Sequence, residues 1–194
     1  MIAKLILEYG LFNHLFFRTV FLSLLIALLL SCDTHPTTKS NYTNQNYDGF
    51  TIVEVEWDDV PLKQVIQTHH QLASNKNQKI FIQITAEWCS PCKRLRTKTE
   101  DPLMKSAYQG VYIIRLDRDE WEKDFAELSI KKTPIPIFWE LNDDPNNLKV
   151  TNYTLGGNYW KEITAKALSP LLKAYFSGQA RPFIENKQSK ASDL

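Results

Sequence analysis

The stretch Ala86-Glu87-Trp88-Cys89-Ser90-Pro91-Cys92-Lys93 places two cysteines three residues apart, directly after an apolar segment. That segment, residues 79–85, reads Lys-Ile-Phe-Ile-Gln-Ile-Thr and predicts a strand, because it is rich in β-branched residues. Cys89 to about Thr99 predicts a helix, whose first turn accommodates Pro91 because the N–H groups there need no helical partner. Cysteines three apart lie on one helix face and can close a disulfide.

The position of Cys89 at the start of this helix predicts a reactive thiol. Free N–H groups and a partial positive charge at a helix N-terminus stabilise a thiolate, which lowers the pKa of the thiol. We therefore expect Cys89 to be the exposed nucleophile that attacks a disulfide in a partner. Cys92 would then release the partner by resolving the mixed disulfide.

Two other uses of the pair are open at this point. A structural disulfide is plausible in a secreted protein, but a bridge closing so short a loop restrains the unfolded chain little. A zinc site needs two more ligands, and the sequence offers no second cysteine pair and no matching histidine spacing. We rank redox chemistry first, a structural bridge second and a metal third, and we expect neither a metal nor a cofactor.

Outward from the motif, predicted strands and helices alternate, which indicates an α/β fold with parallel pairing. A short turn between the last two strands predicts one antiparallel hairpin, so the central sheet is mixed, with helices on both faces. The predicted strands are 51–57, 79–85, 111–116, 134–141 and 148–155. The predicted helices run from Asp58 or Asp59 to Ser74 and over 89–99, 101–108, 120–128 and 160–176.

The size and charge of the chain limit its class. At 194 residues with 43% hydrophobic residues, it suits one folded domain with extensions. The net charge of +1 gives no indication of a nucleic-acid partner. We place the domain at 50–177 and a polar C-terminal tail at 178–194.

The first 31 residues predict a signal peptide. Lys4 and Arg18 precede an apolar run, Val20–Leu30, which has the length of a signal-peptide core. A single membrane-spanning helix over about 5–30 is the second interpretation, although it would place Arg18 near the middle of the bilayer at a cost of a few kcal/mol.

The sequence Leu29-Leu30-Ser31-Cys32 resembles the lipobox of bacterial lipoproteins. This resemblance implies cleavage before Cys32 and attachment of lipid to that cysteine. The three cysteines of the chain are then accounted for, since lipidation of Cys32 leaves the other two as a pair. Residues 32–49 predict a lipidated cysteine with a flexible linker, and we expect the domain to lie on the periplasmic side of a bacterial membrane.

The motif around Cys89 closely resembles the active-site segment of the thioredoxin family, over roughly Phe50 to Phe176. The resemblance implies a thioredoxin-like fold and a cis proline beside the cysteines, at Thr133-Pro134, with Pro136 as the alternative. Members of the family pair the backbone before that proline with their substrate, which gives Thr133 and Pro134 a substrate-binding role. Trp88 resembles the family's surface tryptophan beside the active site, the alternative being a core aromatic residue.

The residues after the motif, with Asp101-Pro102, are similar to the C-terminal domain of the membrane reductase DsbD and its small relatives. Thioredoxins carry a buried acid six residues before the first cysteine, where this chain has Gln83, which cannot act as a base. We therefore expect water or Glu87 to activate Cys92, and resolution to be slow.

These observations predict a thiol–disulfide oxidoreductase that reduces disulfide-bonded proteins of the cell envelope. Such a protein needs a membrane thiol as electron donor and is anchored in the lipid bilayer through the lipid on Cys32. The alternative is a copper chaperone, because soft thiolate pairs suit Cu(I). Copper binding would require Met104 and His69 or His70 to fall close to the pair.

Overall fold

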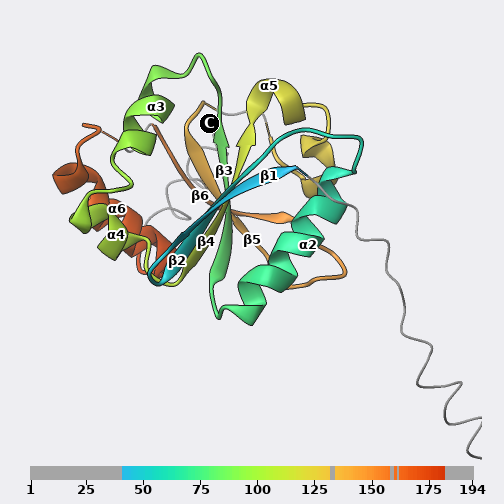
Figure 1. Ribbon diagram of the computed structural model, residues 1–194, viewed down its shortest axis with the longest axis horizontal. Coiled ribbons are helices and arrows are strands. Elements are labelled where there is room, and N and C mark those ends of the chain that lie inside the picture. The colour runs from blue at the N-terminus through green and yellow to red at the C-terminus, as the bar shows by residue number, and fades with distance from the viewer. Residues whose placement is uncertain (1–40, 132–133, 158–159, 161, 182–194) are drawn as a thin grey trace, which may run out of the picture. The chain divides into compact units, whose positions relative to one another are not determined.

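The computed structural model describes residues 41–131, 134–157, 160 and 162–181, all within one unit, Lys39–Leu194. The described elements alternate as predicted, with one extra strand at the start (Figure 1). The strands are β1 Tyr42–Tyr47, β2 Phe50–Val55, β3 Lys79–Thr85, β4 Val111–Asp117, β5 Ile137–Leu141 and β6 Val150–Gly156. The helices are α2 Leu62–Asn75, α3 Ser90–Thr97, α4 Pro102–Ala107, α5 Arg118–Trp121, the 3-10 helix η1 Phe125–Leu128 and α6 Ala165–Phe176.

The six strands form one mixed sheet in the order β1-β2-β4-β3-β5-β6. β2, β4 and β3 run parallel, whereas β1, β5 and β6 pair antiparallel to their neighbours. The predicted mixed sheet is therefore confirmed. Because β3 is central, the segment that leaves its carboxyl end, with both cysteines, emerges between strands that are held on either side.

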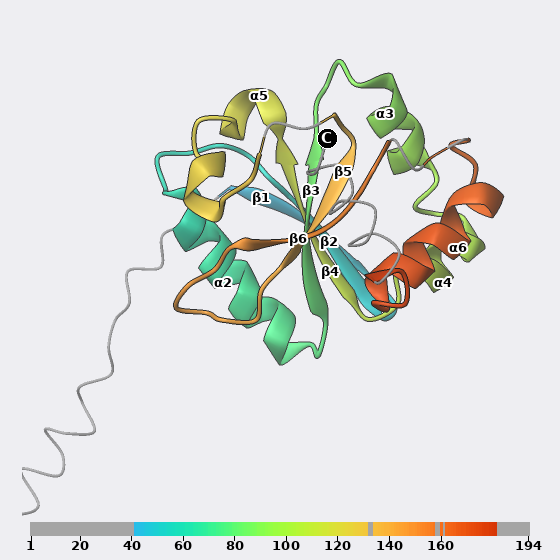
Figure 2. The same cartoon turned by 180° about the vertical axis from the view of Figure 1, so that it is seen from behind.

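Helices cover both faces of the sheet, as predicted. Figures 1 and 2 show α2 and α5 on one face and α3, α4 and α6 on the other. Side chains alternate along each strand, so neighbouring residues enter different cores. On β3, for example, Ile82 packs with Leu62 and Trp121, whereas Phe81 packs with Leu95 and Leu172.

β1 corrects the prediction that residues 32–49 are all a flexible linker. Tyr42–Tyr47 pairs with β2 as an edge strand, and Asp48 and Gly49 form the two-residue turn between them. The segment was missed because five of its six residues are exposed, so it carries no apolar pattern. Asp-Gly is a strong hairpin signal, since the turn needs the positive φ that Gly49 adopts at 82°.

Three predicted helices differ in detail. The helix predicted over 160–176 begins only at Ala165. α2 begins after Pro61, and Asp58 accepts a hydrogen bond from the backbone N–H of Val60 instead of capping the helix. The helix predicted over 120–128 is divided into α5 and η1.

The predicted signal peptide, Cys32 and residues 182–194 of the predicted tail lie outside the described residues. Among those the structure describes, no helix is both long enough and apolar enough to cross a membrane.

Candidate functional site

Cys89 and Cys92 form a disulfide at the start of α3. Their sulfurs are 2.05 Å apart and their Cα atoms 5.2 Å apart. Cys89 is the N-cap residue of α3, and its sulfur accepts a hydrogen bond from the backbone N–H of Cys92 (3.2 Å). Pro91 lies in the first turn, as predicted. The geometry places the sulfur of Cys89 at the positive end of the helix, where a thiolate is stabilised.

Both cysteines are covered in this disulfide form. Cys89 is 3% exposed and Cys92 5% exposed, which differs from the prediction of an exposed Cys89. The reason is a small cluster in which Ala86 and Ile135 pack on the two cysteines. Exposure does not distinguish either sulfur as the nucleophile. The position of Cys89 at the start of α3 favours it instead.

The loop before β5 contains both candidate prolines, and the structure describes the peptide bond of the second. The cis peptide bond that the structure describes in this loop joins Ile135 to Pro136, the alternative proline, and Pro134 is exposed. Ile135, not Pro134, packs on the cysteines. Thr133 lies outside the described residues. The substrate-contact role expected of Thr133 and Pro134 stays a prediction, and the packing of Ile135 on the cysteines makes Ile135 and Pro136 further candidates for that contact.

Trp88 lies on the surface beside the pair, at 63% exposure, as the surface interpretation predicted. Its indole Nε1 donates a hydrogen bond to Oδ2 of Asp119 in α5 (2.7 Å). Asp117 in turn accepts the backbone N–H of Asp119, which fixes the start of α5. The contact of Asp119 with Trp88 could not be predicted from sequence, because no residue near Asp119 in the sequence indicates a tryptophan 31 positions away.

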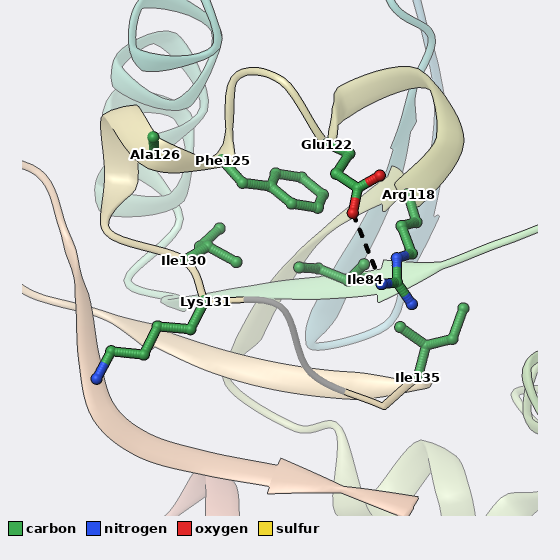
Figure 3. Close-up of a pocket in the computed structure, with 8 residues that line it drawn as sticks. All are labelled: Ile84, Arg118, Glu122, Phe125, Ala126, Ile130, Lys131 and Ile135. Atoms are coloured by element: carbon green, nitrogen blue, oxygen red, sulfur yellow. Dashed lines mark ion pairs between the residues drawn. The ribbon is translucent and has the colours of Figure 1, made fainter.

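A pocket of about 160 Å³ opens beside the cysteine cluster (Figure 3). Its apolar lining includes Ile84, Phe125 and Ile130, and Ile135 joins the pocket to the disulfide. Figure 3 shows Arg118 and Glu122 facing each other over this lining; their charged atoms are 3.7 Å apart. A dry apolar cavity of about 150 Å³ can hold a benzene ring, so this pocket is large enough for one apolar side chain.

Gln83 is buried below α3, and its amide is occupied. Its Oε1 accepts a hydrogen bond from Nε of Arg115 (2.7 Å), whose Nη1 also donates to Oε1 of Glu54 (2.9 Å). The role of Arg115 was not predicted from sequence, although a single cation in the apolar run Val111–Leu116 indicates a buried charge that needs partners. Glu87, the carboxylate predicted to help Cys92, is 80% exposed and forms a loose ion pair with Lys93 (3.8 Å).

Two of the ligands considered for a copper site, Met104 and His69, are buried outside the cysteine cluster. Met104 is buried in the core under α4 and α6, a cluster that does not contain the cysteines. His69 is buried, and its Nδ1 lies 2.8 Å from the hydroxyl of Tyr112. Within the described part of the chain, no group of three or more His, Cys, Asp or Glu residues is arranged to hold a metal ion.

Comparison with known proteins gives one family. Residues 60–155 match the family model described as Thioredoxin. Thioredoxin H8 of Arabidopsis thaliana is 30% identical over 81 residues, 41% of this chain, and the chain spans about half (53%) of that relative's length. Similar solved structures include a Plasmodium falciparum thioredoxin (19% identity, TM-score 0.44, 72% of this chain and 97% of the other). Another is a disulphide isomerase from Xylella fastidiosa (16% identity, TM-score 0.45, 60% and 92%).

Proposed function

This domain belongs to the thioredoxin-like family, and from that premise we propose that the protein is a membrane-anchored reductant of disulfides in envelope proteins. At the level of the domain, the family and the Cys89–Cys92 pair make it a thiol–disulfide oxidoreductase. The observation that carries the proposal is the disulfide at the helix start, with an apolar pocket beside it.

The reaction follows from the position of the two sulfurs. The thiolate of Cys89 attacks one sulfur of the partner's disulfide, and the partner's other sulfur leaves as a thiolate and takes up a proton. Cys92 then attacks the sulfur of Cys89, so the Cys89–Cys92 bond forms and the bond to the partner breaks. The partner gains two electrons and becomes a dithiol, and a thiol donor returns the pair to its reduced form.

The substrate meets the pair through its immediate surroundings. Trp88 is exposed on one side, and Ile135 joins the cysteines to the pocket that Ile84 and Phe125 line. An apolar side chain next to the partner's disulfide would fill this pocket and hold the partner's backbone beside Ile135. Such a site favours peptides over small disulfides, because only a peptide supplies that side chain.

The anchor and the donor complete the proposal. The lipobox resemblance at Cys32 supports a lipid-anchored protein on the periplasmic side of a bacterial membrane, where a membrane thiol reductase would supply electrons. Mass spectrometry of the mature protein from a bacterial host should find Cys32 as its first residue, with acyl chains attached. A mature protein that keeps residues 1–31 and carries no lipid would favour the spanning helix over about 5–30.

The activity is tested by reduction of the insulin disulfides in the presence of dithiothreitol. The full chain should accelerate the reaction, and Cys89→Ser should abolish the acceleration because it removes the nucleophile. Cys92→Ser should instead accumulate a mixed disulfide between Cys89 and insulin, visible under non-reducing conditions. Ser90→Ala, which keeps both thiols, is the matched control. If both cysteine variants retained the activity, the proposal would be wrong.

A further inference from the structure

A buried cation lies under α3, on the same strands that lead to the cysteine pair. The side chain of Arg115 on β4 is 4% exposed. Besides its hydrogen bonds to Gln83 on β3 and Glu54 on β2, its Nη2 lies 3.5 Å from the hydroxyl of Thr99, just after α3. From β4, the guanidinium therefore links β2 and β3 to the segment that directly follows the helix carrying Cys92.

These side chains form one row across the sheet. Glu54 is in register with Arg115, and Arg115 is in register with Gln83. Residues in register on neighbouring strands point to the same face, and here that face is the one covered by α3. The row is continued above the sheet by Arg96 of α3, whose Nη1 lies 3.3 Å from Oε2 of Glu54.

The charge of this cluster is fixed by its composition. Arg96 and Arg115 stay charged at any pH that proteins meet, Glu54 supplies one negative charge to both, and Gln83 is neutral. The cluster therefore carries a formal charge of +1. Arg115 is buried and the side chain of Glu54 is 28% exposed, whereas that of Arg96 is 43% exposed.

Two connections place this charge near Cys92. Arg96 follows Cys92 by four residues in α3, so the two lie on the same helix face one turn apart. Gln83 precedes Ala86 by three residues, roughly 10 Å along a strand, and Ala86 packs on both cysteines. A unit charge about 10 Å away, at an effective dielectric constant of about 20, changes a pKa by about one unit.

We propose that Arg115 is a positioning residue that, together with Arg96 and Glu54, stabilises the thiolate of Cys92. The inference rests on the proposed function, because it concerns the step that resolves the mixed disulfide. In that step the thiolate of Cys92 forms a bond to the sulfur of Cys89, and the partner's sulfur leaves with the electron pair and takes a proton from water. Gln83 cannot accept the proton of Cys92, so charge takes the place of a buried base.

Other charged groups surround the cluster, and the variants proposed below leave them unchanged. A cavity of about 200 Å³ beside Arg115 is also lined by four carboxylates. Glu56 and Glu87 lie just after β2 and β3, Asp117 ends β4, and Glu120 lies in α5. Lys93 lies on α3 and pairs with Glu87. These carboxylates oppose the cluster, and dissolved salt screens the exposed ones. Variants that change only the cluster therefore report its own contribution by difference.

The test measures the pH at which Cys92 becomes reactive. The full chain with Cys32→Ser, whose remaining thiols are the pair, is reduced and mixed with 5,5′-dithiobis(2-nitrobenzoate). Attack by Cys89 releases one nitrothiobenzoate, and resolution by Cys92 releases the second. The rate of the second release, followed by stopped flow across pH, has its midpoint at the pKa of Cys92 in the mixed disulfide.

The variants differ in the formal charge of the cluster. Glu54→Gln raises the cluster charge to +2 and should lower the midpoint by about one unit. Arg115→Gln reduces the charge to zero and should raise the midpoint by about one unit, whereas Arg115→Lys should restore the parent value. Arg96→Gln also gives zero charge at a half-exposed position and should raise the midpoint by a smaller amount, which keeps the test available if Arg115→Gln fails to fold.

A lower midpoint in Glu54→Gln together with a higher midpoint in Arg96→Gln supports the inference, because loosened packing would move both the same way. Equal midpoints in all variants, shifts of one sign, or shifts opposite to these overturn it. A parent protein that releases only the first nitrothiobenzoate contradicts the proposed function itself, which separates the two failures.

Discussion

At the scale of single residues, burial keeps His69 neutral. It lies on the buried face of α2 with its Nδ1 2.8 Å from the hydroxyl oxygen of Tyr112, and burial lowers its pKa from 6.5 to about 4. Between these values the unfolded chain binds a proton that the folded chain does not. The contribution of His69 to stability is therefore fully present above pH 6.5 and is lost as the pH falls towards 4.

We expect the free energy of unfolding to fall by about 3 kcal/mol through His69 alone between pH 7 and pH 4. Denaturant unfolding at a series of pH values measures this loss. His69→Asn keeps a hydrogen-bonding side chain that does not titrate, so its pH dependence should be flatter by that amount. His70→Asn, at the neighbouring position, should retain the parent slope, and a parallel slope in His69→Asn would contradict the account.

The residues of the site differ in how far their roles could be predicted from sequence. Cys89, Cys92 and Trp88 are defined by contiguous sequence and a helix start, which are local properties. Pro136 could not be distinguished from Pro134, because two prolines two residues apart give the same local pattern. The contacts of Arg115 depend on strand register, which joins residues 32 and 61 positions apart and leaves no local trace.

At the scale of elements, the edge strand β1 offers a matched test of the structure. The backbone N–H of Glu56 donates to the carbonyl of Asn41, so these two form a hydrogen-bonded pair. Such pairs alternate along an antiparallel ladder, which directs the N–H of Gln45 towards β2 and that of Asn44 towards solvent.

Gln45→Pro should therefore cost about 1 kcal/mol more than Asn44→Pro, because only the former removes a ladder hydrogen bond. Both side chains are exposed, so neither change removes core packing. Denaturant unfolding of the two variants measures the difference. Equal losses would show that residues 42–47 contribute no paired strand in solution.

The elements that sequence predicted well are those that bury an apolar face. β3 and β4 are nearly continuous apolar runs because both of their faces are covered by helices. β1 buries almost nothing, so its only signal was the Asp48–Gly49 turn. The division between α5 and η1 depends on packing against the sheet, where Trp121 and Phe125 both enter one core.

At the scale of the whole molecule, the alternation of strands and helices was enough to predict a mixed sheet covered on both faces. The short connection after β5 predicted the antiparallel pair with β6. The order of the strands brings the carboxyl end of β3 between β4 and β5, so the cysteine pair, Trp88 and Ile135 meet at one end of the sheet. These residues together form the candidate thiol–disulfide site.

The reduction potential of the Cys89–Cys92 pair tests the central claim most directly. It is measured on the full chain with Cys32→Ser by equilibration with dithiothreitol or glutathione buffers. The account predicts a reversible two-electron couple closer to roughly −270 mV, the level of thioredoxin, than to roughly −120 mV, the level of the oxidant DsbA. A value near roughly −120 mV would make the protein a catalyst of disulfide formation and would contradict its proposed role as a reductant.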